Sequence, residues 1–279
     1  MTTNQMDRRQ FLGKLGGLSA LALTGNAFSG NPVSKPAYAP TSMPATAIYK
    51  GMTLPAYWNE AYSSEESTNA MRELVDLGAN SVCLTTTWYM LTVNSTTIAP
   101  SVDDTPSDTS LVKAITDAKA NGLYVMLKPL IGIKDGEWPG NIDFGADNTK
   151  WTEWFTSYKS FIENYARIAK DNDVDVFCIG NDLASTEPRT NDWNAVAGRV
   201  RQTVGFPGKL TYAANAQNYD GIGFWFNLDY IGMNQLWTPI TSPPVSEPNP
   251  SAEQLMSDLT FLISECERMF TREGIKIIL

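Results

Sequence analysis

The sequence contains no histidine among its 279 residues. This absence excludes catalysis by Ser-His-Asp and Cys-His groups, and it excludes zinc or iron sites that are built on imidazole ligands. Proton transfer in this protein must therefore fall to carboxyl groups, lysine, tyrosine or cysteine. The missing histidine thus points towards carboxylate chemistry.

Cysteine is scarce, and its spacing matches no metal or disulfide motif. The three cysteines, Cys83, Cys178 and Cys266, are far apart in the sequence and lie among apolar neighbours. This arrangement is typical of buried free thiols rather than of a disulfide framework or a metal knuckle. We therefore expect no metal site and no cofactor.

Basic residues are in the minority, with 21 lysines and arginines against 30 aspartates and glutamates and a formal net charge of −9. A nucleic-acid-binding protein normally presents a basic face, and the sequence has no stripe of lysine or arginine. Nucleic acid is therefore excluded as an expected partner. A neutral polar substrate fits this charge better than a phosphate or a polyanion does.

The N-terminal segment resembles a twin-arginine export signal. Arg8 and Arg9 are followed by Phe11 and Leu12 and then by a short apolar run over residues 15–23. This pattern is typical of signals that are recognised by the export machinery for folded proteins. The apolar run is much shorter than the roughly 20 residues of a transmembrane helix, so no stable membrane span is expected.

Residues 24–47 are rich in proline, serine, threonine, alanine and glycine, and this composition predicts a disordered leader. The sequence thus predicts two parts, a signal and leader over residues 1–47 and a folded domain over residues 48–279. We expect the protein to be periplasmic or secreted by a bacterium.

From Tyr49 onward, short β-type runs alternate with amphipathic helical patterns, which predicts a parallel sheet with crossover helices. The runs expected to form strands are residues 50–56, 80–86, 124–128, 174–179, 209–214, 228–233 and 275–279. No glycine-rich phosphate loop follows the first run, which favours a closed barrel over an open, doubly wound sheet. We therefore predict an α/β fold, a (β/α)₈ TIM barrel that is incomplete, with about seven strands present and the eighth βα unit missing.

The helical patterns carry their own start and stop signals. Ser63-x-x-Glu66 forms a capping box before a helix that should end at Gly78. The longest helix is predicted over residues 151–169, where aromatic and apolar residues recur at steps of three and four. A last helix should follow Ser251, whereas residues 215–227 leave room for only a turn or a short helix between two strands.

The predicted strands end in a mixture of aromatic and polar residues. Active sites of barrels are built at the carboxyl ends of their strands. The residues selected there as candidates for a site are Trp58, Trp88, Lys128, Trp138, Asn181, Asp182, Asn234 and Trp237. Tryptophan rings offer stacking surfaces for sugars while amides and charged groups bond to hydroxyls, so we expect a polysaccharide or oligosaccharide substrate. Core packing is the alternative for each tryptophan, and a structural ion pair is the alternative for Lys128.

Several short segments, taken in order and spacing, resemble a known family. They are residues 78–82 (GANSV), 122–129 (GLYVMLKP), 135–140 (DGEWPG), 154–158 (WFTSY), 174–183 (VDVFCIGNDL), 210–215 (LTYAAN), 224–225 (FW) and 228–232 (LDYIG). The resemblance is to glycoside hydrolase family 113, a barrel group of clan A whose known members are mainly β-mannanases. It implies hydrolysis of a β-linked polysaccharide, with mannan as the first choice, by a retaining mechanism.

The resemblance assigns the general acid/base to the residue that follows Gly180-Asn181. The family has a glutamate there, whereas this sequence has Asp182, which is one methylene shorter. A displacement of about 1 Å can reduce a catalysed rate by about 10²-fold. The resemblance also implies that Asn181 bonds a sugar hydroxyl beside the cleaved linkage. The alternatives are a polar strand terminus or helix cap for Asp182 and a turn residue for Asn181.

A retaining glycosidase needs a second carboxylate, about 5–5.5 Å from the first. The resemblance places this nucleophile just past the seventh strand, and the sequence ends within that strand at Leu279. Glu187, Asp220 and Asp229 could be substitutes, but their positions in the sequence favour solvated or capping roles.

We therefore expect a barrel that is truncated at its C-terminus and inactive as it stands, although its intact form would be a hydrolase. The alternative is a non-catalytic barrel that binds glycans. A third possibility is a fragment that does not fold stably, because strands at both edges of an open barrel are unpaired.

Overall fold

The computed structural model describes residues 48–215, 219–234, 251, 253, 264, 268 and 276–278. The predicted signal and leader, Trp237, Cys266 and most of the last predicted helix lie outside the described residues. No helix in the described part of the chain is both long enough and apolar enough to cross a membrane.

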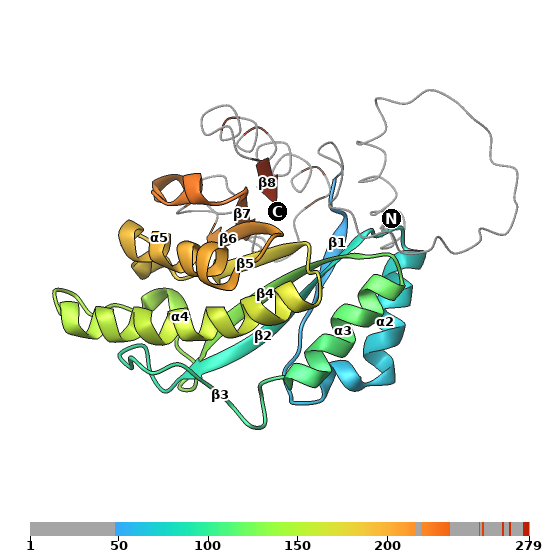
Figure 1. The fold of residues 1–279 in the computed structure, drawn as a ribbon, viewed down its shortest axis with the longest axis horizontal. Coiled ribbons are helices and arrows are strands. Elements are labelled where there is room, and N and C mark those ends of the chain that lie inside the picture. The colour runs from blue at the N-terminus through green and yellow to red at the C-terminus, as the bar shows by residue number, and fades with distance from the viewer. Residues whose placement is uncertain are drawn as a thin grey trace, which may run out of the picture. The chain divides into compact units, whose positions relative to one another are not determined.

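One sheet of parallel strands forms the centre of the domain (Figure 1). Its strands, in spatial order, are β1 (Gly51–Leu54), β2 (Ser81–Met90), β4 (Tyr124–Ile133), β5 (Val176–Asn181), β6 (Lys209–Asn215), β7 (Tyr230–Asn234) and β8 (Lys276–Ile278). A short strand, β3 (Ala99–Pro100), pairs antiparallel with β2. Residues of β1 and β7 line the same cavity, so the sheet curls like part of a barrel. This curled parallel sheet fits the predicted incomplete TIM barrel.

Helices lie between successive strands and cover the outer face of the sheet (Figure 1). They are α2 (Glu65–Asp76), α3 (Asp108–Ala120), α4 (Asn148–Asp171) and α5 (Thr190–Gly198), with a π-helical turn, η4 (Arg199–Val204), directly after α5. The predicted short connection between β6 and β7 is confirmed, because its described residues, 219–229, contain only the 3₁₀ turns η5 (Tyr219–Gly221) and η6 (Trp225–Asn227). Helix α5 was not predicted from the sequence.

The predicted capping box locates the start of α2 correctly but assigns the N-cap to the wrong serine. The N-cap is Ser64, whose hydroxyl accepts a hydrogen bond from the Ser67 amide at 3.2 Å, whereas the Ser63 hydroxyl donates to Glu60. Two adjacent serines offer the same side chain, and only the extended backbone of Ser64 decides between them. The predicted end is confirmed by Gly78, which adopts the left-handed conformation (φ 83°) just beyond the helix.

Helix α4 buries one aromatic face against the sheet, as the three- and four-residue steps predict. Its buried residues are Trp151, Trp154, Phe155, Tyr158, Phe161, Ile162, Glu163, Tyr165, Ala166 and Ala169. Edge-to-face and stacked contacts link these rings to one another and to Trp193 of α5. The core under the middle of the sheet is therefore built largely from aromatic side chains, which hold β4 and β5 in place.

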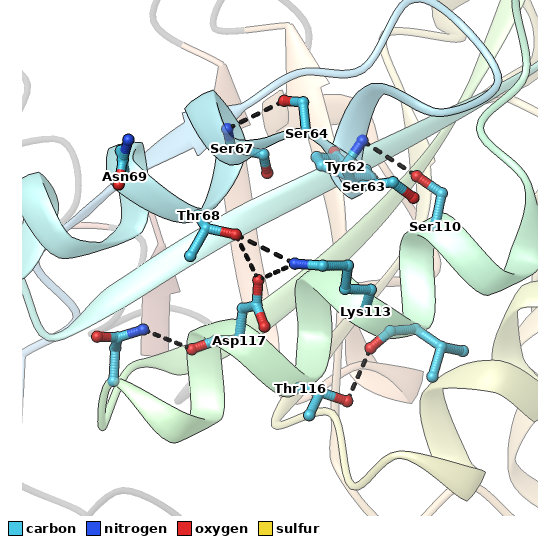
Figure 2. A network of polar contacts seen from close by, with 12 residues as sticks. Tyr62, Ser63, Ser64, Ser67, Thr68, Asn69, Ser110, Lys113, Thr116 and Asp117 are labelled. Carbon is cyan, nitrogen blue, oxygen red and sulfur yellow. Dashed lines mark hydrogen bonds and ion pairs between the residues drawn. The ribbon is translucent and has the colours of Figure 1, made fainter.

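A polar cluster joins α2 to α3 on the outside of the barrel (Figure 2). Lys113 lies 2.5 Å from the carboxylate of Asp117, and the Thr68 hydroxyl donates to the same carboxylate at 2.8 Å. Nearby, the backbone amide of Tyr62 donates to the Ser110 hydroxyl at 3.0 Å. The ion pair is partly exposed, so its contribution to stability is about 1 kcal/mol at most, and the cluster mainly sets how the two helices pack.

Candidate functional site

A β-bulge near the end of β5 shapes the candidate site. Cys178 pairs with Thr211 and Asn181 pairs with Ala213, so an advance of three residues along β5 lies beside an advance of two residues along β6. Without the extra residue, Asn181 would lie on the face opposite to Cys178, because side chains alternate along a strand. Thr211 and Ala213 both line the cavity inside the barrel. The bulge therefore brings Asn181 to the interior face.

The bulge frees backbone carbonyl groups, and nearby side chains satisfy them. The hydroxyl of Tyr158, on α4, donates to the carbonyl oxygen of Ile179 at 2.8 Å, and the Cys178 thiol donates to that of Gly180 at 3.0 Å. A Cβ atom at Gly180 would lie 2.7 Å from the rings of Trp193 and Tyr212. Only glycine fits at this point of the bulge.

Asp182 follows the bulge in a strained backbone conformation. Its φ of 51° is left-handed, a region that aspartate and asparagine tolerate better than other residues with a side chain. Two hydrogen bonds donated by backbone amides hold it there. The Asp182 amide donates to the carbonyl of Ala213 at 2.9 Å, and the Leu183 amide donates to the Tyr212 hydroxyl at 3.0 Å.

The carboxyl group of Asp182 is buried and only half satisfied. Its Oδ2 atom accepts a hydrogen bond from the amide of Asn234 at 2.8 Å, and the same amide donates to Asn181 Oδ1 at 2.8 Å. Its Oδ1 atom is buried and has no hydrogen-bond partner among the described residues. Burial raises the pKa of Asp182, while the Asn234 hydrogen bond and the positive charge of Lys128 act in the opposite direction. The sequence-predicted residues Asn181, Asp182 and Asn234 thus form one cluster.

Glu187 departs from the sequence-based expectation. It was expected to be solvated in a loop, yet it is 5% exposed, and the Tyr212 hydroxyl donates to its Oε1 at 2.8 Å. Burial raises its pKa to about 7, and the negative charge of Asp182 acts in the same direction. The 3₁₀ turn Ala184–Thr186 folds the chain back so that Glu187 lies near Asp182. No sequence signal places Glu187 beside a tyrosine of the following strand, which is why the sequence predicted a solvated or capping role for it.

A cavity of about 380 Å³ occupies the interior of the curled sheet. Lys128 and Asn234 contribute polar groups to its wall, and the hydrogen bond of Asn234 connects the cavity to Asp182. Lys128 forms no ion pair with another described residue. Cys83 and Cys178 also line the cavity as free thiols, and burial raises the pKa of both. These thiols therefore stay protonated and weakly reactive near neutral pH.

The predicted tryptophans lie in different environments. Trp58 and Trp138 are 55% and 44% exposed, on the loops that follow β1 and β4. Trp88 pairs with Ile131, whereas the interior residue Lys128 pairs with Thr85, so Trp88 lies on the opposite face of the sheet from Lys128. Its indole N–H donates to the Tyr165 hydroxyl of α4 at 2.8 Å. Trp88 is thus a packing residue beneath α4, which matches the alternative stated for it.

Asp229 and Asp220 were the other carboxylates considered. Asp229 lies just before β7, where it accepts hydrogen bonds from the Leu210 amide and pairs with Arg201 and Lys209. Asp220 is exposed and lies 3.6 Å from Arg268. Asp229 therefore has the structural role expected of it, at the amino-terminal end of the strands and away from Asp182. No group of three or more histidine, cysteine, aspartate or glutamate side chains able to hold a metal occurs in the described residues.

The chain resembles known proteins in both sequence and fold. The sequence model of glycoside hydrolase family 113 matches residues 55–267. A solved β-mannanase of that family from Alicyclobacillus acidocaldarius, in complex with ManMIm, is 30% identical, with a TM-score of 0.61 over 66% of this chain and 59% of that one. A family 113 β-1,4-mannanase complex is 25% identical, with a TM-score of 0.63 over 77% and 68% of the two chains. The chain thus spans about three fifths to two thirds of the length of these relatives. No curated protein sequence matches it significantly.

Proposed function

The chain belongs to glycoside hydrolase family 113, and on that premise we propose that it is a β-mannanase-type protein that binds β-linked mannan, with Asp182 as proton donor. The observation that carries the proposal is the buried Asp182 carboxyl at the carboxyl end of β5, held on one oxygen by Asn234 and unpartnered on the other. The solved relatives that are 25–30% identical are described as β-mannanases, which supports mannan as the ligand.

The environment of Asp182 suits a general acid. A raised pKa favours the protonated form that a proton donor needs, and burial raises the pKa of this carboxyl from its ordinary value, while the Asn234 hydrogen bond and Lys128 act in the opposite direction. Asn234 donates to Oδ2, so in the protonated form of Asp182 the proton would lie on Oδ1. In the proposed step, Asp182 gives its proton to the glycosidic oxygen of a substrate that reaches the carboxyl end of β5, as the bond from that oxygen to the anomeric carbon breaks and water takes the place of the oxygen on that carbon.

The remaining candidates fit the recognition of a sugar chain. We propose that the exposed rings of Trp58 and Trp138 stack on sugar faces, and that Asn181, Asn234 and Lys128 bond to hydroxyls. Trp237 lies outside the described residues and stays a prediction. Trp88 is left out of the proposed site because it packs beneath α4.

We further propose that the 279-residue chain hydrolyses mannan slowly at best. Asp182 is one methylene shorter than the family's glutamate, and a strained backbone holds it in place. The carboxyl group of Glu187, on which the charge of Asp182 acts, is occupied by Tyr212, and neither of the two carboxyl groups lines the cavity. These same features favour the second candidate function, a barrel that binds glycans without cleaving them.

Two measurements on the full chain test the proposal and separate the two candidates. The first is release of reducing sugar from β-mannan, and the second is calorimetric titration with mannooligosaccharides. Binding without hydrolysis supports the glycan-binding function. Hydrolysis that is abolished by Asp182→Asn supports the enzyme and contradicts the proposed inactivity. If mannan gives no heat of binding and no product, both candidates are contradicted. Asp182→Glu is the informative variant, because it restores the family's side chain at this position.

We also propose export through the twin-arginine route, on the basis of Arg8 and Arg9 and the short apolar run behind them. Expression of the full chain in a bacterium, with Arg8→Lys and Arg9→Lys together as the control variant, tests it. Accumulation outside the cytoplasm that depends on the arginine pair is the expected result. Equal distribution of both proteins between compartments would contradict it.

A further inference from the structure

We infer that Tyr212 and Glu187 are positioning residues that hold the backbone and carboxyl group of Asp182 in place from behind the sheet. This inference rests on the proposed role of Asp182. It assigns a function to the buried glutamate, which the proposed chemistry does not use.

The first step of the argument is the strain at Asp182. A residue with a side chain at φ 51° needs surrounding contacts to stay there, because this region is less favourable than ordinary extended or helical backbone. The anchor on the C-terminal side is the hydrogen bond from the Leu183 amide to the Tyr212 hydroxyl, at 3.0 Å. Removal of that acceptor would free the peptide that follows Asp182.

The second step concerns how Tyr212 is fixed. Its ring packs against Trp193 and Phe224, with centroid distances of 5.1 and 5.2 Å, and it fills the space left by the missing side chain of Gly180. These neighbours are apolar or aromatic, so they locate the ring without engaging its hydroxyl group. The ring itself is therefore immobile.

The third step concerns the hydroxyl proton. A tyrosine hydroxyl has one proton to donate, and Tyr212 donates it to Glu187 Oε1 at 2.8 Å. Its lone pairs are then free to accept the Leu183 amide. Glu187 thus orients the hydroxyl and completes a chain from its own carboxyl through Tyr212 to the peptide after Asp182.

Neither residue is placed to touch a substrate. Along β6, Thr211 and Ala213 line the interior cavity, so Tyr212 between them lies on the outer face of the sheet. Glu187 is buried beside it. Both residues can therefore act on Asp182 only through the backbone and through charge, which defines a positioning role.

The test compares Tyr212→Phe and Glu187→Ala with a matched control, Tyr165→Phe. Tyr165 is another buried tyrosine, whose hydroxyl bonds to Thr86 and Trp88 away from the site. Nuclear magnetic resonance would follow hydrogen exchange of the Leu183 amide and the titration of the Asp182 carboxyl. We expect exchange at Leu183 to rise about tenfold in Tyr212→Phe, and the Asp182 titration to shift, with neither change in the control.

Glu187→Gln keeps an oxygen that accepts from Tyr212, so exchange of the Leu183 amide should stay near the wild-type rate. Glu187→Ala removes that acceptor, so exchange of the Leu183 amide should be faster than in the wild type. If Tyr212→Phe fails to fold, the Glu187 pair decides the question. Unchanged exchange and titration in folded variants would overturn the inference. These readouts need no mannan, so failure of the wild-type chain to bind mannan would overturn the proposed function separately.

Discussion

The side-chain amide of Asn234, at the end of β7, lies 2.8 Å from Oδ2 of Asp182, at the end of β5. These strands are not neighbours, because β6 lies between them. The contact therefore spans two steps of the sheet and depends on the curl that brings the strand ends together. Asn234 therefore both lines the interior cavity and bonds to the buried carboxyl group of Asp182.

Asn234→Ala should raise the pKa of Asp182 further, because the lost hydrogen bond favours the ionised form. Carbon-detected titration of the Asp182 carboxyl measures this shift. The stability cost should be about 1 kcal/mol, the typical net value of one hydrogen bond. Asn227→Ala serves as the control, since its amide bonds to Asn194 on the surface. An identical Asp182 titration in both variants would contradict the assigned contact.

Gly180→Ala should destabilise the protein by about 1–3 kcal/mol. The added methyl group would lie 2.7 Å from the rings of Trp193 and Tyr212, which have little room to move. Gly198→Ala is the matched control, because nothing lies within 4 Å of its added Cβ, and it should be neutral or stabilising by up to about 1 kcal/mol. Urea unfolding compares the two, and equal effects of the two substitutions would show that the bulge is not tightly packed.

Glu187→Gln should change how stability depends on pH. Burial raises the pKa of Glu187 from 4.5 to about 7, so the neutral form is favoured on folding. Its contribution to stability is complete below about pH 4.5 and is lost as the pH rises through about 7. The variant should therefore match the wild type at low pH and exceed it by on the order of 1–3 kcal/mol near pH 8. Parallel stability curves from urea unfolding between these pH values would contradict the raised pKa.

Trp138→Ala should weaken mannooligosaccharide binding by roughly fivefold, equivalent to about 1 kcal/mol of lost ring contact, with little effect on stability. The ring is 44% exposed, so its removal leaves no large buried void. Trp88→Phe should behave in the opposite way, because it removes the hydrogen bond to Tyr165 and costs about 1 kcal/mol of stability without changing affinity. Calorimetry and thermal melting separate the two outcomes. A loss of affinity in Trp88→Phe alone would reverse the assignment of the two rings.

Local patterns in the sequence predicted much of the scaffold. Gly78 ends α2 because only a residue without a side chain adopts its backbone conformation freely, and the aromatic steps of α4 are a property of one segment. The strand positions followed from runs of β-type residues, although β2 and β4 continue to Met90 and Ile133, beyond their predicted ends. That extension places Trp88 within β2, and so on the face that α4 covers.

The sequence by itself determined that acid–base chemistry falls on carboxyl groups, lysine, tyrosine or cysteine, because histidine is absent, and the resemblance of its segment pointed to Asp182 as the candidate. Only the tertiary structure decided the environment of that carboxyl. The bulge before it, the amide of Asn234, and the pairing of Tyr212 with Glu187 all join residues from separate strands and turns. Burial and hydrogen bonding depend on such distant neighbours, so they set a pKa and a side-chain direction that no local pattern contains.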